Sequence, residues 1–143
     1  MIEVNHTALS NITPLFNGWN DVMILSCLQG HLGQAYANKK DAPTVAKIEV
    51  LGVCYAVGDT GSPDAKTLLH QLPSHMELQV QGEAWHNLVK RELSEKTHTF
   101  TRYEFEKDPS MFDTVKLQAY AAQLSSDYTL AAIDAEMFLA CKS

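Results

Sequence analysis

The feature that most constrains the fold is an apolar segment that meets two glycines and then a strand-like run. Residues 19–28 are mainly apolar, Gly30 and Gly33 follow, and residues 34–37 have the composition of a strand. Upstream, Thr13 can cap a helix and Pro14 suits the first helical position. We therefore expect one helix from Thr13-Pro14 to Gly30 or Gly33, with the chain turning there into a strand.

The rest of the chain alternates between helical and strand patterns. Residues 44–57 are β-branched and apolar around Gly52, which predicts one or two strands with a turn or bulge at Leu51-Gly52. Further strands are expected at residues 76–81, 97–106 and 128–133. Further helices are expected after Ser62-Pro63, from Trp85, after Asp113 and after Asp134. This order predicts an α/β (α+β) class with a mixed, mostly antiparallel sheet and flanking helices.

Length and charge limit the classes of function. A chain of 143 residues is expected to form a single domain, residues 1–143. The net charge of −6 disfavours binding to phosphate backbones, so no nucleic-acid partner is expected. No run is long and apolar enough to span a membrane, and the N-terminus lacks the basic and apolar regions of a signal peptide. We therefore expect a cytoplasmic protein without a membrane partner.

The cysteines and histidines show no spacing typical of a disulfide framework or a zinc site. Cys27, Cys54 and Cys141 are odd in number, widely spaced and set in apolar sequence, which favours buried free thiols. None of the six histidines forms a His-x-x-x-His pair or combines with a cysteine at zinc spacing. No metal is expected.

Short motifs along most of the chain have the order seen in one enzyme family. They are Leu15–Trp19, Ser26–Gly30, Gly33–Ala37, Gly52–Gly58, Trp85, Arg102-Tyr103, Phe112-Asp113, Lys116-Leu117, and Tyr128, Leu130, Ile133 and Asp134. The chain resembles the N-terminal half of the GNAT-type acetyltransferase family that includes the zwittermicin A resistance proteins. It departs from the pattern at Leu25, where tryptophan is expected, and at Leu51-Gly52-Val53, where Gly-Asp-Phe is expected.

The resemblance implies transfer of an acetyl group from acetyl-CoA to a small amine. It also implies a pyrophosphate loop of pattern Gln/Arg-x-x-Gly-x-Gly/Ala between a strand and a helix N-terminus. We find no such pattern in that context. The expectation is therefore an N-terminal domain whose acetyl-CoA-binding half is absent, with no cofactor in this chain, acetyl-CoA for the full-length protein, and an inactive isolated chain. The catalytic residues stay unassigned.

Two glycine motifs approach a phosphate loop without meeting its requirements. Residues 30–35 have the spacing Gly-x-x-Gly-x-Ala, but the expected order is helix then strand, so a helix C-cap and a tight turn are preferred. Residues 61–67 carry Ala65 where a P-loop needs glycine before its lysine. In that motif Pro63 removes a donor and Asp64 adds a negative charge, which excludes nucleotide binding.

Three residues are candidates for substrate binding: Gln29, Arg102 and Tyr103. Gln29 is polar at the end of an apolar helix. Its side chain either hydrogen-bonds to a substrate amide or completes the hydrogen bonds of buried backbone groups near the turn. Arg102 and Tyr103 lie on an expected strand, where they border a substrate cleft or where Arg102 pairs with Glu104. The alternative function is a non-catalytic interaction module. It would bind a partner chain or form a homodimer through an open sheet edge and the apolar last helix.

Overall fold

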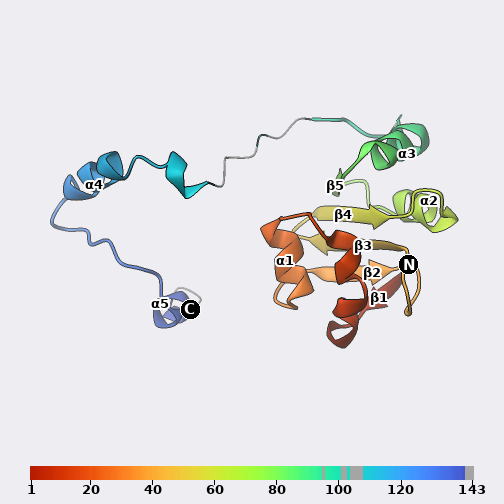
Figure 1. Cartoon of the computed structure of the whole chain (residues 1–143), viewed down its shortest axis with the longest axis horizontal. Coiled ribbons are helices and arrows are strands. Elements are labelled where there is room, and N and C mark those ends of the chain that lie inside the picture. The colour runs from red at the N-terminus through yellow and green to blue at the C-terminus, as the bar shows by residue number, and fades with distance from the viewer. Residues whose placement is uncertain (95, 101–102, 104–107, 141–143) are drawn as a thin grey trace. The chain divides into compact units, whose positions relative to one another are not determined.

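The computed structural model describes residues 1–94, 96–100, 103 and 108–140. The contacts within the chain divide it into two compact units, Met1–Thr99 and Phe100–Ser143, called the first and second units below. Figure 1 shows the sheet in the first unit and separate helices in the second. The prediction of a single domain stays a prediction.

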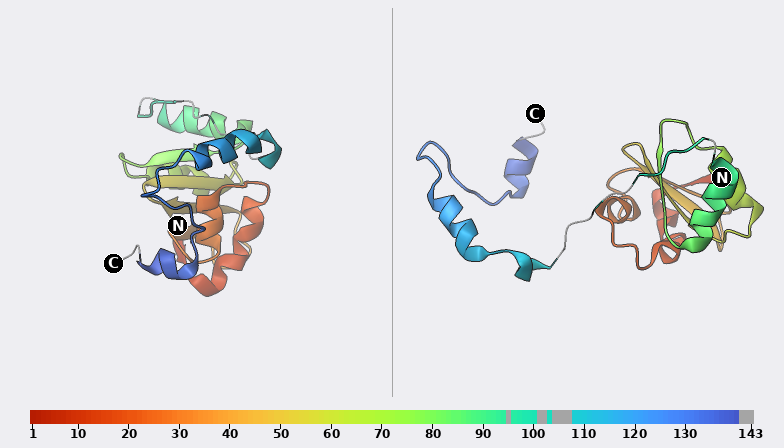
Figure 2. Two further views of the ribbon diagram at one scale, coloured as in Figure 1. Left: turned by 90° about the vertical axis from the view of Figure 1, so that its left-hand side faces the viewer. Right: turned by 90° about the horizontal axis from the view of Figure 1, so that it is seen from above.

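The first unit contains a five-stranded sheet among the described residues. Its strands are β1 (Ile2–Val4), β2 (Gln34–Ala37), β3 (Val45–Val50), β4 (Val53–Gly58) and β5 (Glu77–Val80), and they lie in that order across the sheet. The first three pairs are antiparallel, and β5 is parallel to β4. This confirms the mixed, mostly antiparallel sheet with flanking helices. In Figure 2 the sheet lies between the N-terminal helices and α2 with α3.

Each face of the sheet has its own apolar core. On one face, Ile24 and Cys27 of α1 (Val22–Leu28) pack with Ile48 of β3. On the other face, Leu68 of α2 (Pro63–His70) and Leu88 of α3 (Glu83–Leu93) pack with Ala56 of β4. Because successive strand residues point to opposite faces, β3 and β4 supply both cores.

The turn between β3 and β4 is a two-residue hairpin. Leu51 and Gly52 both have positive φ, +48° and +86°, and Val50 pairs with Val53. Positive φ at both central residues is the type I′ geometry that matches the twist of the flanking strands. The prediction of two strands with a turn at Leu51-Gly52 is confirmed.

The predicted single helix from Thr13 to Gly30 is wrong, because it is divided into a 3-10 helix and an α-helix. The segment η2 (Thr13–Phe16) follows η1 (His6–Asn11), and Gly18, with φ of +83°, then interrupts the helical path. Asp21 caps α1, since its Oδ1 accepts a hydrogen bond from Met23 N at 2.8 Å. Trp19 therefore lies in the connection, half-buried, with its ring 5.5 Å from that of Tyr55.

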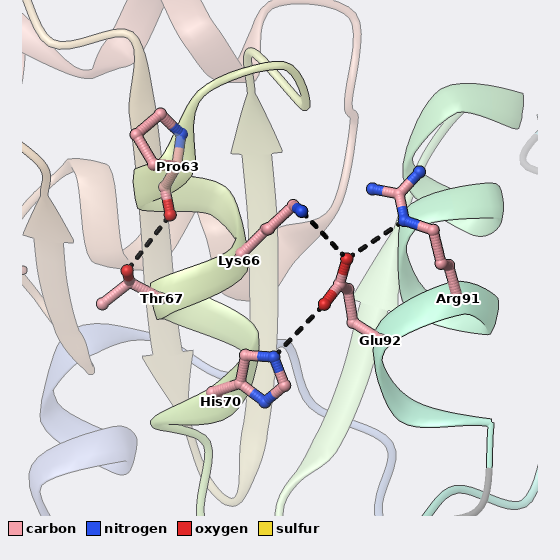
Figure 3. A network of polar contacts seen from close by, with 6 residues as sticks. All are labelled: Pro63, Lys66, Thr67, His70, Arg91 and Glu92. Carbon is pink, nitrogen blue, oxygen red and sulfur yellow. Dashed lines mark hydrogen bonds and ion pairs between the residues drawn. The ribbon is translucent and has the colours of Figure 1, made fainter.

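Helices α2 and α3 are joined at their surface by a charge network (Figure 3). The Glu92 carboxylate accepts from Arg91 Nε at 3.0 Å, pairs with Lys66 Nζ at 3.4 Å and contacts His70 Nε2 at 3.3 Å. Hydrogen bonding from Arg91, helped by His70 and Lys66, lowers the pKa of Glu92. Exposed ion pairs add little stability each, so this network orients two helices whose packing comes from their apolar faces.

The second unit has helices but no strand among its described residues. It contains η3 (Pro109–Met111), α4 (Thr114–Ala122) and α5 (Ala135–Ala140). Asp113 and Asp134 cap α4 and α5, as predicted, by accepting from Lys116 N and Met137 N. No described helix of the chain combines the length and the apolar character that crossing a membrane requires.

Two strand predictions fail in the described residues. Tyr128–Ile133 has no strand structure, and neither do residues 97–100 and Tyr103. Residues 101, 102 and 104–107 of the second predicted strand lie outside the described residues. A β-strand needs a neighbour to complete its hydrogen bonds, and the described residues of both segments pair with no strand of the sheet.

Candidate functional site

Two of the three predicted substrate-binding residues lie in different units of the chain, and the third lies outside the described residues. Gln29 is the exposed C-cap residue of α1, and its N–H bonds to the carbonyls of Leu25 and Cys27. Tyr103 belongs to the second unit and is 93% exposed. Arg102 lies outside the described residues. Substrate binding by these residues stays a prediction.

The glycine motif at residues 30–35 is a helix end, as expected. Gly30 has φ of +77°, its N–H bonds to Cys27 O at 2.8 Å, and His31 N bonds to Ser26 O at 2.9 Å. These bonds satisfy the last carbonyls of α1. A shallow depression of about 310 Å³ lies beside this turn, with Val4, Leu9 and Cys27 among its lining residues. Burial raises the pKa of the Cys27 thiol, so this cysteine is a poor nucleophile at neutral pH.

A second polar group lies on β2, β3 and β4. Lys47 is 7% exposed, pairs with Glu49 and lies 4.7 Å from the centre of the Tyr36 ring. Burial raises the pKa of the neighbouring Cys54 to about 12, Lys47 acts against this and Glu49 adds to it. Lys47 already has both a carboxylate and an aromatic partner, so this group is a satisfied internal ion pair. The described residues contain no set of His, Cys, Asp and Glu that could hold a metal ion.

The connection between β4 and α2 has the strand-loop-helix order that a phosphate loop requires. Residues 58–63 read Gly-Asp-Thr-Gly-Ser-Pro between the end of β4 and the first turn of α2. If Gly61 takes the inner glycine of the pattern Gln/Arg-x-x-Gly-x-Gly/Ala, Gly58 takes the Gln/Arg position and Pro63 the last one. This strand-loop-helix context at residues 58–63 was not predicted from the sequence, in which only residues 61–67 were compared with a P-loop.

Gly58 has no room for a side chain. Its φ is +109°, and a Cβ there would lie 2.0 Å from Thr44 O and 2.8 Å from Val45 Cα. Its carbonyl accepts a hydrogen bond from Trp85 Nε1 at 3.0 Å. The backbone at this position is therefore held on both sides, and the first residue of the pattern can only be glycine.

Three backbone donors at the loop and the start of α2 already bond inside the chain. Gly61 N bonds to Asp59 Oδ1 at 2.9 Å, and Ser62 N bonds to Asp59 O at 3.2 Å. Asp64 N bonds to Ser62 Oγ at 3.2 Å, which is the N-cap bond of α2. Pro63 has no N–H to offer. A helix N-terminus binds an anion through free N–H groups, and these groups are occupied.

The carboxylate of Asp64 lies at the start of α2, where it is favourable to the helix dipole. Its Oδ2 accepts a hydrogen bond from Asn38 Nδ2 at 2.8 Å. The Asn38 amide also donates to Thr44 Oγ1 and accepts from the N–H groups of Thr44 and Val45. One side chain thus connects the turn after β2, the start of β3 and the first turn of α2. Nothing in the sequence pattern marks Asn38, which is 26 residues from Asp64.

Comparison with known proteins places these features in a family. The family described as GNAT acetyltransferase matches residues 13–143. No curated protein matches the chain significantly. A solved structure, the GCN5-related N-acetyltransferase-like protein from Streptococcus suis 89/1591, is similar in fold with a TM-score of 0.64 and 24% sequence identity. The match covers 94% of this chain and 54% of that chain, so this chain spans about half of the length of the solved structure.

Proposed function

The chain belongs to the GNAT acetyltransferase family, and from this premise we propose that it is the N-terminal part of an enzyme that transfers an acetyl group from acetyl-CoA to an amine. The observation that carries the proposal is the family match over residues 13–143. The finer similarity to the zwittermicin A resistance proteins rests on the motifs quoted from the sequence and is part of the proposal.

Within the proposal, the fold and the loop after β4 support assigning coenzyme binding to a part of the enzyme other than this chain. The first unit supplies a mixed sheet with helices on both faces. At the loop of residues 58–63, Gly61 N, Ser62 N and Asp64 N bond within the chain, and Gly58 and Pro63 stand at the first and last positions of the coenzyme pattern. We therefore assign coenzyme binding to residues outside this chain and expect the isolated chain to be inactive.

The chemistry of the step is nucleophilic attack by a neutral amine on the thioester carbonyl. It needs a base that removes the ammonium proton and a donor that stabilises the oxyanion. Within the proposal, Gln29, Arg102 and Tyr103 contact the amine substrate. Acetyl-CoA supplies the acetyl group when bound.

The test compares the product of the natural reading frame with the 143-residue chain. Both are incubated with acetyl-CoA and a panel of primary amines, and the released CoA thiol is measured. We expect amine-dependent release of CoA by the protein that the natural reading frame encodes and none by the isolated 143-residue chain. If the protein that the natural reading frame encodes releases no CoA with any amine of the panel, the proposal is wrong. Amine-dependent release of CoA by the isolated chain would contradict the assignment of coenzyme binding to residues outside it.

A homodimer is the second candidate, and the exposed apolar side chains of the second unit favour it. Leu117, Tyr120 and Leu130 are 51%, 66% and 69% exposed, and α5 carries the half-exposed Phe138. Sedimentation at micromolar concentration is expected to show a dimer that Phe138→Glu dissociates. Val22→Glu is the matched control, because Val22 is an exposed apolar residue of the first unit. A monomeric wild type would overturn this candidate.

A further inference from the structure

We infer that this chain's own side chains prevent the loop between β4 and α2 from binding the coenzyme pyrophosphate. In place of a ligand site, the Asn38–Asp64 hydrogen bond holds the β2–β3 turn against the start of α2, and this pair is called the structural tie below. The inference concerns residues 38–65 only. It uses the phosphate-loop pattern expected for the family but does not depend on whether the complete protein transfers acetyl groups.

The first argument is steric. The pattern places a glutamine or arginine side chain at the position of Gly58, where it can reach a phosphate. At Gly58 a Cβ would meet Thr44 O at 2.0 Å and Val45 Cα at 2.8 Å; Thr44 directly precedes β3, and Val45 is the β3 residue that pairs with Gly58. Backbone in a paired strand cannot move aside without breaking the sheet. The loop therefore cannot regain the missing side chain by a single substitution.

The second argument is electrostatic. Two carboxylates, Asp59 and Asp64, lie where a pyrophosphate would bring its own negative charges. Like charges at such short range repel each other, and the helix dipole favours only one anion in the first turn. Asp64 already holds this position from within the chain.

Backbone N–H donors of the loop also have acceptors within the chain, which compete with any ligand that diffuses in. Gly61 N and Asp64 N bond to acceptors two residues away in sequence, so these bonds form without any loss of translational freedom. A ligand would have to break these bonds before it could use the same donors. The expected result is a connection that joins the β2–β3 turn to α2 and leaves the phosphates unbound.

The closure is tested by nuclear magnetic resonance on the isotope-labelled 143-residue chain. Inorganic pyrophosphate and acetyl-CoA are titrated separately, and the amide signals of Gly61, Ser62, Asp64 and Ala65 are followed. We expect no saturable shift of these signals up to millimolar ligand. A saturable shift at these amides with a sub-millimolar dissociation constant would overturn the inference. Such a shift would not contradict the proposed acetyl transfer, because that activity is measured on the protein that the natural reading frame encodes.

The structural tie is tested by a double-mutant cycle. Asn38→Ala and Asp64→Ala are each expected to raise the unfolding equilibrium constant about fivefold or more, and the double variant is expected to fall clearly short of the product of the two effects. Asp41→Asn, an exposed acid in the same turn, is the control and should leave the constant nearly unchanged. Fully multiplicative effects of the two variants would show that the pair contributes nothing as a pair.

Discussion

The two units of this chain begin their helices in the same way but differ in what the helices do next. In the first unit, Asp21 and Ser62 cap α1 and α2, and those helices then bury Ile24 and Leu68 completely. In the second unit, Asp113 and Asp134 cap α4 and α5 equally well, yet no described residue there is buried. A cap is a local interaction, whereas burial needs a partner surface.

The difference teaches which sequence signals are sufficient by themselves. A capping residue acts within three residues of the chain, so it works in any surroundings. An isolated helix of six to nine residues is still marginal in water, because nucleation is costly. The sheet of the first unit supplies the packing that offsets this cost for α1 and α2, whereas the described residues of the second unit contain helices and no strand.

The largest expected contrast is in amide hydrogen exchange. Amides of β3 and β4, paired on both sides in the sheet, should exchange at least about a thousandfold more slowly than those of residues 128–133. Mass spectrometry of deuterium uptake over minutes to hours measures this. Slow exchange in residues 128–133 of the isolated chain would break the comparison, because it would mean that this segment is paired or packed.

A large stability difference is expected between two aromatic truncations. Trp85→Ala should cost about 3–5 kcal/mol, because the ring is buried and its indole N–H donates to Gly58 O. Tyr120→Ala in α4 should cost under about 0.5 kcal/mol, since Tyr120 is 66% exposed. Denaturant unfolding followed by fluorescence and circular dichroism measures both. Equal costs would contradict the burial difference.

Alkaline pH should destabilise the first unit through Cys54. Burial raises the pKa of this thiol from 9.0 to about 12, so above pH 9 the unfolded chain releases a proton that the folded chain keeps. Stability therefore falls as the pH rises from 9 towards 12, by about 1.4 kcal/mol at pH 10. Cys54→Ala should flatten this dependence relative to wild type. An unchanged slope in the variant would show that Cys54 does not cause it.

The smallest effects are expected from the caps. Ser62→Ala should lower the unfolding free energy of the first unit by about 1 kcal/mol, because Ser62 Oγ accepts from Asp64 N. Asp113→Ala should reduce the helix content of α4 and leave the unfolding transition of the first unit unchanged. Circular dichroism and denaturant midpoints separate the two results. A lowered midpoint for Asp113→Ala would show that α4 contributes to the stability of the first unit.

Most of the first unit follows from local patterns. The hairpin at Leu51-Gly52 and the cap at Ser62 are each determined within a few residues. The expected continuous helix from Thr13 failed because Gly18, with positive φ, ends the helical path after η2, and Asp21 caps a new helix, α1. The Thr13 hydroxyl donates to Leu9 O at 3.0 Å and caps nothing.

The candidate site was less predictable than the fold. Pro63 and Asp64 were recognised from the sequence as obstacles to phosphate binding, since a missing N–H and a negative charge are properties of single residues. The steric closure at Gly58 could not be predicted, because it depends on Thr44 O of the adjacent β3 edge. The role of Asn38 could not be predicted either, since its partner Asp64 is distant in sequence.

The sequence by itself predicted the order of elements from β2 to α3, the helix caps at Ser62, Asp113 and Asp134, the hairpin turn and the family resemblance, because each depends on neighbouring residues or on an ordered set of motifs. Only the tertiary structure decided that β5 lies parallel beside β4, that Lys47 is buried against Glu49 and Tyr36, and that Asn38 holds the start of α2. These contacts join segments that are far apart in the chain. Their energies come from packing and hydrogen bonds that exist only after the sheet has formed.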